Sequence, residues 1–176
     1  MRLFIAVRFP EKVLDRIVSA QDEMKRAGIR GRYTSRENLH LTLAFIGEYG
    51  DPDFVAEALE RSVSEPFTLR ISGTGNFGSI LWAGFERSEH LDKLAKRIRR
   101  SLAEAGIPFD RKKFSPHITL VRDAYVPQDA GFGSGFMDMS GDPVLVEGVS
   151  LMRSERGKNG MIYTELAYIQ LIEEQE

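Results

Sequence analysis

The chain has 176 residues, 42% of them hydrophobic, and a formal net charge of -2 at pH 7. These values fit a single soluble domain with one core, and they exclude a protein whose whole surface is basic enough to attract nucleic acid. The lack of cysteine excludes disulfides, thiolate nucleophiles and cysteine zinc sites, and with no long apolar run or signal-peptide pattern we expect a cytoplasmic protein.

The first half of the chain alternates between strand and helix patterns. Residues 3 to 9 are apolar and β-prone, and a helical stripe of apolar residues then runs to Gly28, which is expected to end the helix. Residues 39 to 46 form the next predicted strand. Asp51 is placed to cap a second helix, and the alternating residues 67 to 71 predict another strand.

The same order of elements begins again near residue 80. Ser88 is placed to cap a helix that Gly106 ends, just as in the first half. Residues 124 to 142 are rich in Gly, Pro, Asp and Ser, which predicts a long mobile loop. The loop is expected to be a solvated connection, with closure over a ligand as the alternative. The strands expected in this half are residues 81 to 85, 117 to 121, 144 to 152 and 161 to 171.

The two halves form an approximate internal repeat. Gly28 and Gly106 end the two helices, and His40 and His117 follow them at nearly matching distances. We therefore predict a mixed α/β (α+β) fold with two pseudo-symmetric lobes, each holding a mainly antiparallel sheet and outer helices, around a central cleft. The whole chain, residues 1–176, is expected to be one domain, with the repeat over roughly 1–75 and 79–176. A chance likeness between two strand-helix-strand units is the alternative.

Two of the three histidines are followed by threonine two positions later, in His40-Leu41-Thr42 and His117-Ile118-Thr119. Side chains alternate along a strand, so the histidine and threonine of each motif share one face while the leucine or isoleucine points to the other. The apolar face packs and the polar face is left for the cleft. The repeat is expected to bring both histidines to one small group.

Two imidazoles and two hydroxyls suit the cleavage of a phosphate diester. One neutral histidine accepts a proton from water and one protonated histidine donates a proton to the leaving oxygen, while hydroxyls bind the non-bridging oxygens. No metal or other cofactor is needed. Zinc is the main competing use of paired histidines, but the sequence has no HExxH motif and no third histidine at suitable spacing. A half-buried structural histidine is the alternative for each motif taken alone.

Several residues near the motifs are weaker candidates for substrate binding. Basic residues precede both motifs, among them Arg36 and Lys113, and Arg122 follows the second. Strict alternation puts Arg122 on the face opposite His117, so only a strand end or a twist would turn it inward. The aromatic residues that offer a ring to a nucleobase, although most are expected in the core, are Tyr33, Phe114, Phe4 and Trp82.

Four segments together resemble one known family. They are Arg2-Leu3-Phe4-Ile5-Ala6, residues 38–47 around the first motif, Leu81-Trp82-Ala83-Gly84, and residues 115–122 around the second. They resemble the RNA 2',3'-cyclic phosphodiesterase family, also called 2'-5' RNA ligase, among the two-histidine phosphoesterases. The likeness covers nearly the whole chain. It departs at Tyr33, where many relatives carry tryptophan.

The resemblance implies a bilobal fold and hydrolysis of 2',3'-cyclic phosphate ends of RNA to 2'-phosphates. It implies that His40 is the proton donor and His117 the proton acceptor, with Thr42 and Thr119 binding oxygen. The expected partner is RNA with a cyclic phosphate end, tRNA fragments included. The protein is expected to be a monomer and to have no membrane partner. Alternatives are reversible 2'-5' joining of RNA ends, a small cyclic-nucleotide phosphodiesterase, and a module that binds RNA ends without turnover.

Overall fold

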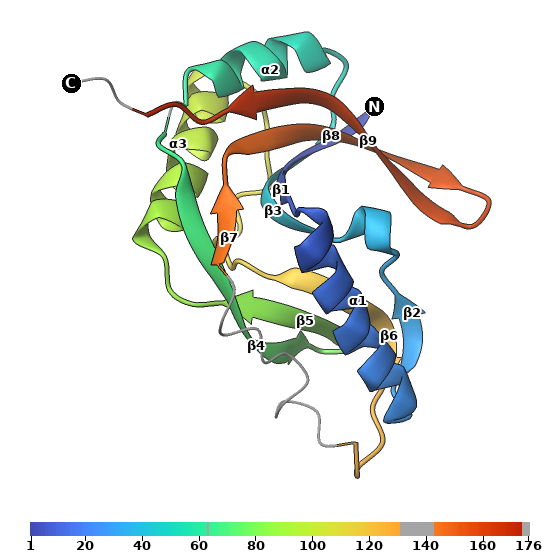
Figure 1. The fold of residues 1–176 in the computed structure, drawn as a ribbon. Coiled ribbons are helices and arrows are strands. Elements are labelled where there is room, and N and C mark those ends of the chain that lie inside the picture. Colours follow the sequence, from blue (N-terminus) through green and yellow to red (C-terminus); the bar gives the residue numbers. More distant parts are fainter. Residues whose placement is uncertain (63, 131–142, 174–176) are drawn as a thin grey trace.

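The computed structural model describes residues 1–62, 64–130 and 143–173, and Figure 1 shows its elements. The helices are α1 (Glu11–Arg26), α2 (Pro52–Glu60) and α3 (Glu89–Glu104), with a short 3-10 helix at Arg36–Asn38. The strands are β1 (Arg2–Arg8), β2 (Arg30–Tyr33), β3 (His40–Glu48), β4 (Phe67–Phe77), β5 (Ile80–Phe85), β6 (Ile118–Tyr125), β7 (Pro143–Val146), β8 (Gly148–Gly157) and β9 (Gly160–Gln170).

The strands form two antiparallel sheets, with orders β3-β1-β8-β9 and β2-β6-β5-β4-β7. The expected mixed α/β class with antiparallel sheets is therefore confirmed. Each sheet takes strands from both ends of the chain: β8 and β9 join β1 and β3, whereas β2 joins β6. The sequence did not predict β2, and it merged β7 and β8 into one strand over 144 to 152.

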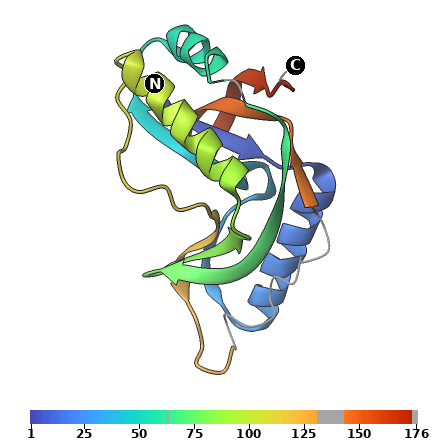
Figure 2. The same cartoon turned by 90° about the vertical axis from the view of Figure 1, so that its left-hand side faces the viewer.

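The long helices α1 and α3 each contact the sheet that does not contain the strand before them, and Figure 2 shows them lying along the sheets. On α1, the buried amide of Gln21 donates to the carbonyls of Thr34 and Leu120, both at 3.0 Å, and so ties the helix to the second sheet. On α3, the Arg99 guanidinium donates to Leu43 O at 3.4 Å in the first sheet. α2 packs against α3, β8 and β9.

Both long helices end in the same way. Gly28 has φ +87 and Gly106 has φ +73, a left-handed conformation that glycine adopts without steric cost. In each case the next residue, Ile29 or Ile107, is buried and donates its N–H back to a carbonyl five positions earlier. Ser88 also caps α3 as expected, since its Oγ accepts the Leu91 N–H at 3.1 Å.

One hydrophobic core runs through both sheets. A second, small cluster of Phe4, Ala6 and Met152 lies on the other face of the first sheet, with Tyr163 packed against it. Of the loop expected at 124 to 142, the part from 131 to 142 lies outside the described residues.

Candidate active site

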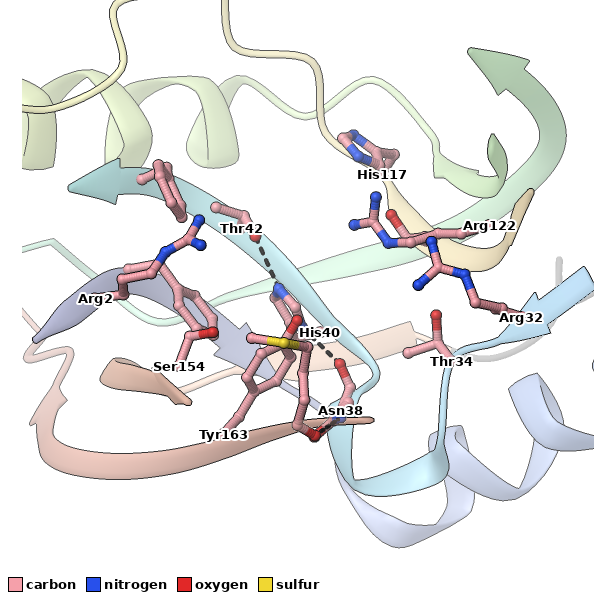
Figure 3. Close-up of a pocket in the computed structure, with 14 residues that line it drawn as sticks. Arg2, Arg32, Thr34, Asn38, His40, Thr42, His117, Arg122, Ser154 and Tyr163 are labelled. Carbon is pink, nitrogen blue, oxygen red and sulfur yellow. Dashed lines mark hydrogen bonds between the residues drawn. The ribbon is translucent and has the colours of Figure 1, made fainter. Parts of the chain in front are cut away.

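A cavity of about 390 Å³ is lined by residues of both sheets, and Figure 3 shows its walls. Both HxT motifs contribute to it, so the structure brings together the histidines and threonines that the sequence singled out. The lining residues are Arg2, Phe4, Arg32, Thr34, Asn38, His40, Thr42, Phe45, His117, Thr119, Arg122, Ser154, Met161 and Tyr163.

His40 opens β3 and is held by its neighbours in the chain. Its Nδ1 lies 2.6 Å from the carbonyl oxygen of Asn38, and its Nε2 lies 2.8 Å from Thr42 Oγ1. A carbonyl only accepts hydrogen bonds, so Nδ1 carries a hydrogen and donates it. Nε2 is therefore the nitrogen that gains or loses a proton.

His117 stands just before β6 and is held by the equivalent contact. Its Nδ1 donates to the carbonyl oxygen of Ser115 at 2.7 Å, again two positions earlier. The edge of its ring packs against Phe77, with ring centres 5.1 Å apart. Both imidazoles thus have a fixed tautomer, which leaves the two Nε2 atoms for acid-base chemistry.

The surroundings of His40 favour its neutral form. Burial lowers the pKa of His40 below the ordinary value, the hydrogen bond to Asn38 raises it in part, and the charges of His117, Arg122 and Arg8 lower it further. Its ring also packs against Phe4 at 5.0 Å and Tyr163 at 5.4 Å. An anion in the cavity would act in the opposite sense and favour protonation.

The candidate ligand Arg122 lines the cavity, although strict alternation would put it on the face opposite His117. In the β5-β6 pairing, Leu81 faces Val121 but Trp82 faces Thr119, which leaves Leu120 as an extra residue in β6. This β-bulge resets the alternation. Thr119 and Arg122 consequently point to the same side although an odd number of positions separates them.

A second arginine stands beside Arg122. Arg32 is its cross-strand partner in β2, and the two guanidinium groups lie together at one end of the cavity (Figure 3). Arg32 Nη2 and Nε both lie 2.7 Å from Asp123 Oδ2, so that carboxylate offsets one of the two charges. This end of the cavity is suited to bind an anion.

Two of the expected basic ligands do not line the cavity. Arg36 forms ion pairs with Glu11 and Asp15, and it fixes the 3-10 helix to α1. Lys113 is exposed on the segment before the second motif. Neither belongs to the cavity wall.

Two of the expected aromatic ligands are also placed elsewhere. Tyr33 faces Val121 across the strands, packs against the core, and donates its hydroxyl to Ile29 O at 2.7 Å. Phe114 packs against the same core, with the Arg99 guanidinium 5.7 Å from its ring centre. Both rings pack in the fold, and Tyr33 also lines a second cavity beside this one. Trp82 is likewise outside the cavity wall, whereas Phe4 belongs to it.

The part of the wall that comes from β9 could not be predicted from the sequence. Tyr163 and Met161 lie far from both motifs in the chain, and no pattern marks them. Asn38 connects them to the site, since its Nδ2 donates to Met161 O at 2.8 Å while its carbonyl holds His40. Only the pairing of β9 with β8, far along the chain, brings these residues to the cavity.

Two further features concern ligands and membranes. Within the described ranges, His, Asp and Glu side chains nowhere gather in a group of three or more that suits a metal ion. His90 stands apart from the cavity, exposed in the first turn of α3. None of the helices in the described residues is long and apolar enough to cross a membrane.

Comparison with known proteins gives consistent matches. The family model of the 2'-5' RNA ligase superfamily matches residues 10–132. An RNA 2',3'-cyclic phosphodiesterase of Thermus thermophilus is 35% identical over 94% of this chain and 88% of its own length. One from Thermotoga maritima is 34% identical over 72% of each chain. Among solved structures, Escherichia coli LigT complexed with 3'-AMP superposes with a TM-score of 0.78 and 27% identity over 98% of both chains.

Proposed function

Because the chain belongs to the 2'-5' RNA ligase superfamily, we propose that it hydrolyses 2',3'-cyclic phosphate ends of RNA to 2'-phosphates. The observation that carries this proposal is the pair of imidazoles on one cavity, each with Nδ1 bound to a backbone carbonyl and Nε2 left for proton transfer. The relatives named as RNA 2',3'-cyclic phosphodiesterases support the same substrate.

In the proposed reaction, His117 Nε2 removes a proton from water as the water oxygen attacks phosphorus. The bond between phosphorus and O3' breaks, and His40 Nε2 donates its proton to O3', leaving the phosphate on O2'. The lowered pKa of His40 makes its protonated form a stronger acid, and the negative phosphate offsets the cost of protonating it. The assignment of donor and acceptor follows the family resemblance.

Hydroxyls and guanidinium groups would stabilise the charge that develops on the phosphate. Thr42 and Thr119 stand next to the two histidines on the cavity wall. Thr119 is suited to donate to the non-bridging oxygens, and so is Thr42 once His40 Nε2 is protonated and no longer accepts the Thr42 hydroxyl hydrogen. Arg122 would add a full positive charge at the same place. This set supplies proton transfer and charge stabilisation from side chains, so we propose a reaction that needs no metal.

Phosphorus NMR of 2',3'-cyclic AMP incubated with protein and a chelator tests the proposal. We expect conversion to 2'-AMP, and His40→Ala and His117→Ala each to lower kcat/KM by about a hundred- to ten-thousand-fold. His90→Ala is the matched control because it removes the remaining, exposed histidine, and it should leave the rate unchanged. Full activity in either cavity variant, or turnover that stops with chelator, would contradict the proposal.

A further inference from the structure

A dense basic stretch lies outside the cavity, on α3 and the segment that follows it. Residues 93–113 hold eight lysines and arginines and only two acidic residues, although the whole chain has 24 basic and 26 acidic residues. Figure 2 shows the segment leaving the end of α3 and running down to β6. We call five exposed residues of this stretch the basic surface: Lys96, Arg100, Arg111, Lys112 and Lys113.

Arg99 joins the helix and the segment into one surface. Its Nη1 donates to Lys112 O at 2.7 Å, and its guanidinium lies 5.9 Å from the ring centre of Phe109. The Arg111 guanidinium approaches the same ring at 4.8 Å. Arg99 therefore holds the backbone of the segment against α3, and the Arg99 and Arg111 guanidinium groups share one aromatic ring.

The basic surface adjoins the cavity at the end away from Arg122. The Asp110 N–H donates to Phe45 O at 2.8 Å, so the segment runs along the strand that carries His40. Phe45 lines the cavity, with the Arg2 guanidinium 5.5 Å from its ring centre. In Figure 3, Arg2 and the Arg122–Arg32 pair stand at opposite ends of the cavity.

Much of this positive charge has no carboxylate to neutralise it. Arg100 pairs with Glu104 at 3.2 Å, but within the residues that the structure describes no carboxylate lies within ion-pair distance of the Lys112 or Lys113 ammonium. On α1, by contrast, Lys25 approaches Asp22 at 4.0 Å. A surface with unpaired lysines attracts the phosphates of a nucleic acid strand.

We propose that the RNA strand upstream of the cyclic end lies across the basic surface. This inference rests on the proposed function. The cyclic phosphate occupies the arginine end of the cavity, the nucleoside extends toward Phe45 and Arg2, and the strand leaves past residues 110–113. The preferred substrate is then an RNA chain of several nucleotides, and phosphates beyond the last nucleotide contribute to binding.

The other way out of the cavity passes the β8-β9 hairpin. A cavity of about 700 Å³ adjoins the first one there, and Lys158 is its one lysine. Its remaining charged lining residues are Arg32, which is paired with Asp123, the acidic Glu37, and Arg122. Fewer unpaired positive charges line this route, so we assign the strand to the basic surface.

The test compares charge reversals with two substrates, 2',3'-cyclic AMP and a ten-nucleotide RNA with a cyclic phosphate end. Lys112→Glu/Lys113→Glu alters the basic surface, Lys158→Glu alters the hairpin route, and Lys12→Glu/Arg26→Glu on the exposed side of α1 is the control. We expect wild-type kcat/KM to be higher for the ten-nucleotide RNA than for the mononucleotide.

Lys112→Glu/Lys113→Glu should lower kcat/KM about tenfold or more, and only on the ten-nucleotide RNA. The slope of log kcat/KM against log salt concentration should be shallower by about 1.4, the value expected for the loss of two phosphate contacts. The inference would be overturned if the control variant lost as much kcat/KM, or if Lys158→Glu lost more. It would also be overturned if the first double variant lost kcat/KM on the mononucleotide too, or if the wild type showed no preference for the longer RNA. Absence of turnover of 2',3'-cyclic AMP by the wild type would instead contradict the proposed function.

Discussion

Phe45 and Arg122 hold equivalent positions in the two HxT strands, each three residues after the threonine and each on the cavity wall. The cause is the same bulge in both strands. Ile5 faces Ala44 while Ala6 faces Thr42, which leaves Leu43 as the extra residue of β3, as Leu120 is in β6. The repeated backbone thus presents an aromatic ring at one end and a guanidinium at the other, and this difference gives the substrate a direction.

The charge of His117 is one cause of the lowered pKa of His40, so the two rings should be coupled in solution. Replacing His117 by Gln removes a positive neighbour, which favours the protonated form of His40, and the pKa of His40 should rise. Titration of the imidazole signals by proton NMR measures it. His90→Gln should leave the pKa of His40 unchanged. An unchanged pKa of His40 in His117→Gln would mean that the two imidazoles do not interact electrostatically.

The threonine hydroxyls are expected to act on the phosphate rather than on the fold. Thr42→Val and Thr119→Val keep the shape and remove the donor, and each should lower kcat by about 10- to 100-fold, the value of a hydrogen bond to a charged group. Thr→Ser at either position should restore most of the rate. Steady-state kinetics checks this, with the exposed Thr68→Val as control. Unchanged kcat in both valine variants would refute the role.

Arg122 should contribute more to anion binding than Arg32, because Asp123 already offsets the charge of Arg32. Arg122→Gln should weaken binding of the product 2'-AMP by about 10- to 100-fold, and Arg32→Gln by less. Isothermal titration calorimetry measures both, with the exposed Arg156→Gln as a surface control. The reverse order of the two losses would count against this view of the cavity.

Gly31 allows β2 to approach the bulged strand closely. It has φ +151, and a Cβ there would lie 2.7 Å from Val121 Cγ1 and 2.8 Å from Arg122 O. Gly31→Ala should therefore lower the free energy of unfolding by about 1–3 kcal/mol through overpacking. Urea unfolding followed by circular dichroism gives the value. Gly50→Ala, where a Cβ meets nothing within 4 Å, should change it little, and equal effects would be inconsistent with the close approach.

The sequence predicted what local patterns determine. Helix caps such as Ser88 and the glycine ends of α1 and α3 lie where expected because a few neighbouring residues fix them. The HxT motifs were found because alternation puts histidine and threonine on one face. Alternation alone could not put the candidate ligand Arg122 on the cavity wall, because the bulge that turns it inward arises from pairing between strands, which no single segment reveals. Tyr163 was missed for the same reason, as its strand joins the site only through long-range pairing.

The placement of β8 and β9 beside β1 also determines when the cavity is finished during translation. A ribosome synthesises both HxT motifs well before it reaches Tyr163, and the sheet that bears His40 lacks β9 until that strand has been made. A growing polypeptide therefore cannot assemble the complete cavity around His40. The part of the wall that β9 supplies is in place only after the β8-β9 hairpin has left the exit tunnel, so the proposed substrate would meet a complete cavity only from that point on.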